Sequence, residues 1–233
     1  QHMKAALVTG ASSGIGEAIS KALLTQGYQV YGIGRDFSSC PLTDIPHFYP
    51  VEFSLTDTQK LPELIKGLRK KASFSLLVNN AGTAYFGLHE EQNAKKIHEM
   101  VAVNLEAPLI LTQLLLRDLK AAKGTVLFIS SVTAKKSSPH GCAYGATKAG
   151  LSSFSKSLFD EVRKYGVRVI TIHPDMTQTN LYRNADFKEG DTPDTYLLPE
   201  EIADAAMAAL SARDGLVLTD ITISPQRHQL GKH

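Results

Sequence analysis

Short runs of β-branched and apolar residues recur along the chain and constrain its fold more than any other sequence feature. They do not alternate with polar residues, which is typical of strands buried on both faces of a parallel sheet. Five such runs cover residues 5–8, 29–33, 76–78, 126–129 and 167–172, and a last strand is expected over residues 216–223.

Segments with helical periodicity separate these runs. In the first segment, Ile15, Ile19 and Leu23 fall on one stripe, and Gly27 marks the end of the helix. The other expected helices cover residues 61–71, 91–120, 143–165 and 199–211. This alternation of strand and helix predicts the α/β class, with a single doubly wound parallel sheet of the Rossmann type.

We expect one domain over residues 3–227, because parallel α/β sheets of this size commonly form one unit. The least regular stretch, about 179–198, mixes charged residues with Gly190 and Pro193 and is expected to be a substrate loop. Gln1 and His2 precede Met3 and are expected to be a remnant of cloning.

The composition argues against several classes of protein. With 43% hydrophobic and 21% charged residues, the chain can bury a large core. The net charge is +2 and the basic residues are scattered, unlike the basic stripe of a nucleic-acid-binding protein. No apolar run approaches the roughly 18 residues of a membrane span, and Cys40 and Cys142 form neither a disulfide framework nor a metal-ligand pattern. We expect a cytoplasmic protein that acts on a small molecule, without a nucleic-acid, membrane or metal partner.

A glycine-rich loop follows the first strand and opens the first helix. Its glycines permit a tight turn and a close approach to a ligand, and the helix N-terminus offers free N–H groups to a phosphate. We therefore expect the pyrophosphate of a dinucleotide to bind there, although a tight strand-to-helix turn alone would also explain the glycines. The residues expected to bind it are Gly10, Ser12, Ser13, Gly14, Ile15 and Gly16.

The end of the second strand reads Gly34-Arg35-Asp36, at the place where this fold presents a residue to the adenosine ribose. An arginine there matches a 2'-phosphate, whereas an acidic residue favours a free 2'-hydroxyl. Arg35 therefore predicts NADPH. The alternatives are that Asp36 takes the ribose and selects NADH, or that the two residues form a surface pair.

Tyr144 and Lys148 lie one turn apart on the helix that is expected over residues 143–165, with Cβ atoms roughly 6 Å apart. A free tyrosine has a pKa of about 10, and a neighbouring ammonium favours the phenolate. The pair is therefore expected to exchange protons near neutral pH. The same spacing also occurs on ordinary solvated helix faces.

Taken together, the motifs resemble those of the short-chain dehydrogenase/reductase family over essentially the whole chain. They occur in the family's order and approximate spacing, with Ser131 standing 13 positions before Tyr144. The matching elements are Thr9-Gly10-x3-Gly14-x-Gly16, Asn79-Asn80-Ala81-Gly82, Asn104, Ser131 and Tyr144-x3-Lys148.

The resemblance implies roles for the catalytic residues. Ser131 would hold the substrate carbonyl oxygen, Tyr144 would give it a proton, and Lys148 would bind the nicotinamide ribose and assist the tyrosine. Ser130 is the alternative to Ser131, disfavoured because neighbouring residues of a strand point to opposite faces. A hydride from the cofactor would complete the reduction.

Asn104 would act through its backbone carbonyl, which the family uses to hold a water on a proton path to Lys148. In an α-helix that carbonyl would accept from the N–H of residue 108, but Pro108 has none. A kink that frees the carbonyl is therefore expected. The alternative is a plain helix break filled by solvent.

Further cofactor contacts follow from the same resemblance. Asn80, Ala81 and Gly82 would lie beside the adenosine ribose and the nicotinamide, although Asn80 also suits a simple turn. Thr179 would hold the carboxamide, with Thr177 at another position facing the cofactor. Asp175 stands where the family usually has glycine, and His173 is interpreted as a packing residue.

These observations predict NADPH-dependent, reversible reduction of a ketone or aldehyde, by a homodimer or homotetramer as the resemblance implies. NADH is the less favoured cofactor. A 3-oxoacyl thioester reductase is the alternative within the class, and a catalytically idle NADP-binding sensor or scaffold is the alternative outside it.

Overall fold

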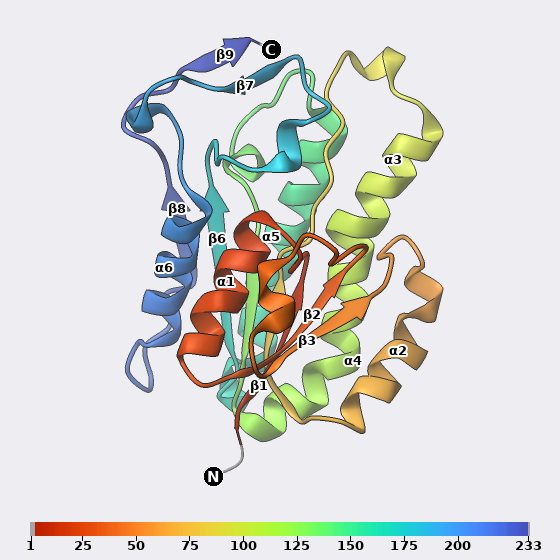
Figure 1. Cartoon of the computed structure of the whole chain (residues 1–233), viewed down its shortest axis with the longest axis vertical. Helices are drawn as coiled ribbons and strands as arrows, with labels where there is room; N and C mark the ends of the chain where they lie inside the picture. The colour runs from red at the N-terminus through yellow and green to blue at the C-terminus, as the bar shows by residue number, and fades with distance from the viewer. Residues whose placement is uncertain (1–2, 233) are drawn as a thin grey trace.

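The computed structural model describes residues 3–232 and confirms the predicted fold class. Seven strands form one sheet in the order β3-β2-β1-β4-β5-β6-β8, and every pairing within it is parallel. Helices cover both faces (Figure 1). The expectation about Gln1 and His2 lies outside the described residues.

The strands and helices have the following bounds. The sheet contains β1 (Ala5–Thr9), β2 (Gln29–Gly34), β3 (Phe48–Glu52), β4 (Phe74–Asn79), β5 (Thr125–Ile129), β6 (Arg168–Pro174) and β8 (Asp220–Ile223). A separate two-stranded sheet pairs β7 (Phe187–Glu189) with β9 (Leu230–Lys232). The α-helices are α1 (Gly14–Thr25), α2 (Leu61–Arg69), α3 (Ala94–Val101), α4 (Ala107–Ala122), α5 (Cys142–Val162) and α6 (Pro199–Leu210).

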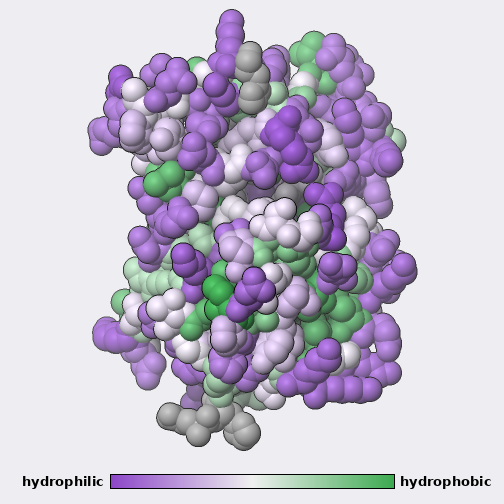
Figure 2. Space-filling model, in the orientation of Figure 1, coloured by the Kyte–Doolittle hydropathy of each residue, from purple (hydrophilic) through white to green (hydrophobic). Residues whose placement is uncertain are grey.

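Two apolar layers hold the helices to the sheet. On one face, α2, α4 and α5 bury residues such as Ile65, Leu115 and Leu158 against the strands. On the other face, α1 and α6 contribute Ile19 and Ile202 to a second buried cluster. Hydrophilic side chains cover much of the outline of the molecule (Figure 2). Because the central strands are covered on both sides, their sequences are continuously apolar.

The two edges of the sheet differ from the sequence prediction. The sequence of β3 contains no apolar run that would predict a strand, because Tyr49 and Pro50 are exposed and only Phe48 is buried. Proline is tolerated there because an edge strand leaves some N–H groups unpaired. At the other edge, the expected strand over 216–223 is limited to Asp220–Ile223, which pair with Thr171–Pro174 of β6.

The single helix expected over 91–120 is two helices joined by a π-helical segment, Ala102–Glu106. By length and composition alone, the combined helix Ala94–Ala122 is the one described helix that could cross a membrane. Its apolar residues include Leu111, Leu115 and Leu119, which are fully buried in the core that covers the sheet. The hydropathy of this helix is therefore that of a core element.

The expected substrate loop at 179–198 contains more structure than its sequence indicated. It holds β7, whose partner β9 comes from the last residues of the described chain. An ion pair between Arg227 and Asp194 joins the same two segments. The domain boundary predicted at residue 227 therefore leaves out a strand that packs on the loop.

Two glycines test how tightly the elements pack. A Cβ at Gly32 of β2 would lie 2.7 Å from Ala11 Cβ and 2.8 Å from the Phe48 ring, whereas one at Gly67 of α2 would meet nothing within 4 Å. We expect Gly32→Ala to lower the free energy of unfolding by about 1–3 kcal/mol through overpacking. Gly67→Ala should raise it by about 0.5–1 kcal/mol, because alanine favours the helix.

Urea denaturation of the two variants beside the wild type measures both changes. Changes of the same sign in the two variants would contradict this account of the packing.

Candidate functional site

The parallel strands end at one edge of the sheet, and the loops that follow β1, β2, β4, β5 and β6 line a cavity there. This is the edge where open α/β sheets bind ligands. Most of the residues predicted from the sequence line this cavity. Gly16 and Asn104 do not line it, but they contact Gly10 and Thr83, which do. The predicted residues that line it are Gly10, Ser12, Ser13, Gly14, Ile15, Arg35, Asn80, Ala81, Gly82, Ser131, Tyr144, Lys148, Thr177 and Thr179.

The glycine-rich loop needs its glycines for two different reasons. Gly10 and Gly14 have φ angles of +65° and +57°, in the left-handed region that glycine adopts without strain. Gly16 instead allows α1 to approach β1, since a Cβ there would run into the Gly10 carbonyl oxygen. The first turn of α1 consequently points its N–H groups at the cavity, where an anion would accept from them.

Asn80 ties the end of β4 to the end of β1. Its side-chain Nδ2 donates to the carbonyls of Thr9 and Gly10 at 3.0 and 3.3 Å. In return, Thr9 Oγ1 accepts from the backbone N–H groups of Asn80 and Ala81 at 3.0 and 2.9 Å. The asparagine therefore holds the glycine-rich loop in shape, as the simple turn interpretation expected, and it also lines the cavity.

Ser131 follows β5, and its hydroxyl has a defined orientation. The Oγ atom accepts from the N–H of Thr133 at 3.2 Å and from Thr133 Oγ1 at 2.9 Å. Two accepted hydrogen bonds occupy both lone pairs of the hydroxyl oxygen, so its own proton is free to be donated elsewhere. Ser131 thus offers a hydrogen-bond donor to the cavity.

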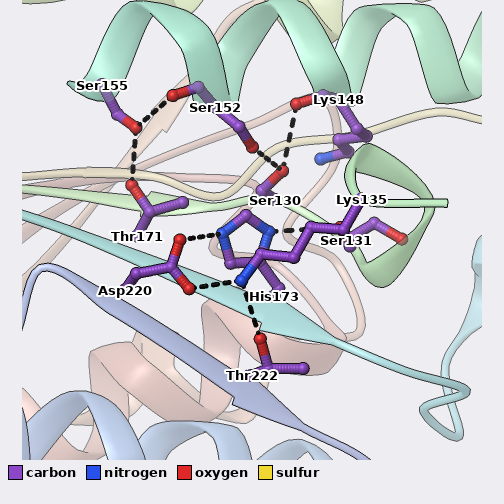
Figure 3. Close-up of polar contacts among 10 residues, drawn as sticks. All are labelled: Ser130, Ser131, Lys135, Lys148, Ser152, Ser155, Thr171, His173, Asp220 and Thr222. Carbon is purple, nitrogen blue, oxygen red and sulfur yellow. Dashed lines mark hydrogen bonds and ion pairs between the residues drawn. The ribbon is translucent and has the colours of Figure 1, made fainter. Parts of the chain in front are cut away.

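Ser130 also borders the cavity, but its hydroxyl is engaged with α5. Its Oγ donates to the Lys148 carbonyl at 3.2 Å and lies 2.9 Å from Ser152 Oγ, on the buried side of α5 (Figure 3). Further along α5, Ser155 Oγ donates to the Ser152 backbone carbonyl at 2.9 Å and accepts from Thr171 Oγ1 at 2.8 Å. Ser130 therefore secures α5 to the sheet, and Ser131 faces the ligand space.

Tyr144 and Lys148 are both buried, at 4% and 3% exposure, near the start of α5. The Lys148 Nζ atom lies 5.8 Å from the centre of the Tyr144 ring and donates to the Ile129 carbonyl at 3.0 Å. The two groups thus share one face of the helix, as their spacing predicted.

Burial sets the protonation of this pair. It raises the pKa of Tyr144 to about 12, against a smaller opposing effect of the hydrogen bond with Ser131. It lowers the pKa of Lys148 to about 8. The expected decrease in the tyrosine pKa toward neutrality is therefore wrong for the protein by itself, because loss of hydration destabilises the phenolate more than its neighbours stabilise it.

Asn104 lies in the π-helical segment that ends just before Pro108, so the expected interruption of the helix is present. Its side chain is fully buried and clamps Thr83, accepting from the Thr83 N–H and donating to the Thr83 carbonyl, both at 2.8 Å. A third bond reaches Thr147 Oγ1 at 3.2 Å. The amide therefore joins the loop after β4 to α5, while the role expected of its backbone carbonyl stays a prediction.

Arg35 and Asp36 occupy different environments at the end of β2. Arg35 is exposed and lines the cavity. Asp36 accepts from the N–H of Ser38 at 2.8 Å, and this bond lowers the pKa of its carboxyl. The carboxylate thus has a local partner in the turn, which leaves the guanidinium as the group available to a ligand.

Thr177 and Thr179 line the cavity after β6. Thr177 Oγ1 donates to the Asp175 carbonyl at 2.8 Å, and Thr179 Oγ1 accepts from the Leu181 N–H at 3.3 Å. Asp175 does not adopt a positive φ, so its side chain causes no backbone strain in place of the family's usual glycine. Its carboxylate accepts from the Met176 N–H at 2.9 Å.

An aromatic cluster that the sequence did not predict lies beside Tyr144. The Phe86 ring lies 5.7 Å from that of Tyr144 and 6.0 Å from that of Tyr182, and Phe187 lies 5.1 Å from Phe86. Phe86 belongs to the loop after β4, and Tyr182 and Phe187 belong to the segment 179–198. Their aromatic character was the available signal, but only the fold shows that they meet.

A family model described as short chain dehydrogenase matches residues 4–190. An uncharacterized short-chain type dehydrogenase/reductase of Sinorhizobium fredii is 33% identical over 235 residues, covering 97% of this chain and 93% of the relative. A protein of Ornithobacterium rhinotracheale described as an NADPH-dependent 3-dehydrocapnine reductase is 32% identical, covering 82% of this chain and 71% of its own.

The fold is also similar to solved structures. An alcohol dehydrogenase of the archaeon Thermococcus sibiricus, complexed with 5-hydroxy-NADP, aligns with a TM-score of 0.86 and 27% identity over 98% of this chain and 99% of its own. A metagenomic short-chain oxidoreductase in complex with NADP aligns with a TM-score of 0.81 and 27% identity, over 95% of this chain and 97% of its own. By both sequence and structure, the chain belongs to the short-chain dehydrogenase family.

Proposed function

We propose that this oxidoreductase reduces a ketone or aldehyde to the alcohol with NADPH, in a reversible reaction. The observation that carries the proposal is the meeting of Ser131, Tyr144 and Lys148 in a cavity that continues to the glycine-rich loop and to Arg35. One end of the cavity thus offers proton chemistry, and the other offers donors to phosphates.

The residues present fit a nicotinamide dinucleotide. The N–H groups at the start of α1 would hold the pyrophosphate, Arg35 the 2'-phosphate and Lys148 the nicotinamide ribose. Glycines keep this space open: a Cβ at Gly14 would reach to 3.3 Å from Thr179 Cγ2, and one at Gly82 to 3.6 Å from Lys148 Nζ. The bound cofactor would supply a hydride to the carbonyl carbon.

The protein's own groups would handle the charge and the proton. Negative charge grows on the carbonyl oxygen during reduction, and the Ser131 hydroxyl, which also lies within reach of the Tyr144 oxygen, would donate a hydrogen bond to it. Tyr144, protonated because its burial raises its pKa to about 12, would donate the proton that completes the alcohol. The Lys148 ammonium would stabilise the resulting phenolate, and the Asn104 backbone carbonyl would hold a water that returns the proton.

The comparisons support NADPH as the cofactor. Two similar solved structures carry NADP or a derivative of it, and the relative described as a 3-dehydrocapnine reductase is NADPH-dependent. The pairing of Asp36 with Ser38 in its turn supports the same choice. We further propose a homodimer or homotetramer in the cytoplasm, as the family resemblance implies.

Replacing Tyr144 by phenylalanine tests the proposed proton donor. We expect Tyr144→Phe to lower kcat about 10²- to 10⁴-fold, the usual contribution of a general acid, while NADPH still binds. The assay follows loss of NADPH absorbance over a panel of ketones, aldehydes and 3-oxoacyl thioesters, with NADPH affinity measured by fluorescence titration. Tight NADPH binding without any turnover that depends on Tyr144 would favour an idle sensor instead.

Replacing Arg35 tests the cofactor preference. We expect Arg35→Leu to raise KM for NADPH about 10- to 100-fold, the loss of a charged hydrogen bond, and to change KM for NADH little. Asp36→Asn is the matched control, because its carboxylate is directed to Ser38. An unchanged KM for NADPH in the Arg35 variant, or loss of NADH use in the Asp36 variant, would argue against this assignment.

The pH dependence tests the role of Lys148. Its pKa of about 8 means that the ammonium is lost as the pH rises through 8, while Tyr144 keeps its proton until about pH 12. We therefore expect kcat for reduction to fall above about pH 8. Lys148→Arg should be slower but lack this fall, since arginine stays charged. A wild-type rate that stays level to pH 10 would contradict the assignment.

A further inference from the structure

A buried histidine lies directly behind the proposed catalytic serine. His173 stands near the end of β6, its side chain is fully buried, and it does not line the cavity. Figure 3 shows its ring between the backbone of Ser131 and the carboxylate of Asp220 on β8. Both ring nitrogens have polar partners, and one of these partners is the backbone of Ser131 itself.

The hydrogen bonds of the ring specify its orientation. Nδ1 lies 3.2 Å from the Ser131 carbonyl oxygen, and Nε2 lies 3.1 Å from Asp220 Oδ2. A carbonyl oxygen only accepts, so the contact with Ser131 is a hydrogen bond in the forms of the ring that carry a proton on Nδ1. The Asp220 carboxylate also only accepts, so both contacts are hydrogen bonds at once only in the imidazolium form. Burial opposes this charged form and lowers the pKa of His173, while the Asp220 carboxylate acts in the other direction.

Asp220 anchors both ends of the loop that begins at Ser131. One carboxylate oxygen holds His173, and the other accepts from Lys135 Nζ at 2.5 Å. Lys135 also donates to Thr222 Oγ1 at 3.0 Å, next along β8 on the same side. Burial by itself would raise the pKa of Asp220, but the bonds from Lys135 and His173 lower it, so the anchor is a carboxylate.

We propose that His173 is a positioning residue for Ser131, oriented by Asp220. The bond to the Ser131 carbonyl fixes the peptide that directs the serine hydroxyl toward the substrate, and Lys135 fixes the far end of the same loop. This inference rests on the proposed role of Ser131. A displacement of about 1 Å at such a hydroxyl is enough to cost about 100-fold in rate.

Three variants separate positioning from simple packing. His173→Leu removes both hydrogen bonds and should lower kcat about 10- to 100-fold with NADPH affinity unchanged. His173→Asn keeps a donor at the place of Nδ1 and should retain most of kcat, whereas His173→Gln places its amide nearer Asp220 and should retain less. Ile172→Val, a fully buried neighbour on β6, is the control for loss of core packing.

The decisive readout is a double-mutant cycle with Ser131→Ala. If His173 acts through the serine, His173→Leu should change the rate of the Ser131→Ala enzyme by no more than about twofold. An equal loss in both backgrounds would overturn the proposal. If Ser131→Ala is too slow to measure or His173→Leu does not fold, the comparison of His173→Asn with His173→Gln decides. Equal kcat values for these two variants would count against the positioning role of His173.

Hydrogen–deuterium exchange provides a test that needs no substrate. The His173 variants, and not Ile172→Val, should speed exchange at residues 131–135, whose loop loses its anchor. Unchanged exchange in His173→Leu would overturn the proposed positioning. A wild-type protein that reduces no carbonyl would instead count against the proposed function, and the exchange result would still decide whether His173 holds the loop.

Discussion

The parallel hydrogen-bonded ladder between β1 and its neighbours β2 and β4 is the constraint on which the rest of the structure depends. Because the strands run in one direction, their carboxyl ends meet at one edge, and the loops that follow β1 to β6 open into the same space. The hydrogen bonds between Asn80 and Thr9 then fix two of these loops to one another. The cavity is a consequence of strand direction, completed by a few local ties.

Burial gives this edge its chemical character. Tyr144, Lys148 and His173 are nearly or fully inaccessible to solvent. Loss of hydration destabilises the charged form of each side chain, so the pKa of each is shifted in the direction that favours its neutral form. Tyr144 thereby keeps its proton at neutral pH, and the pKa of Lys148 falls to about 8. Lys148 donates to the Ile129 carbonyl, Ser131 accepts from Thr133, and the His173 ring contacts the Asp220 carboxylate, so each group is restrained.

Signals that act over short stretches of sequence were read correctly. The spacing of Tyr144 and Lys148, the separate directions of Ser130 and Ser131, and the interruption before Pro108 follow from the geometry of one helix or one strand. The edges of the sheet were not read correctly, since β3 has only one buried residue and β8 is half the expected length. At an edge, pairing with a single neighbour decides the strand, and apolar runs are not required.

The sequence by itself determined the α/β class, the glycine-rich loop and the candidate residues of the site, because these depend on periodicity and on residue types at short spacing. Only the tertiary structure decided that Phe86, Tyr182 and Phe187 form one cluster, and that β9 pairs with β7. It also decided the protonation of Tyr144 and the polar role of His173. Hydration and long-range partners set these properties, and both arise only when distant segments are packed together.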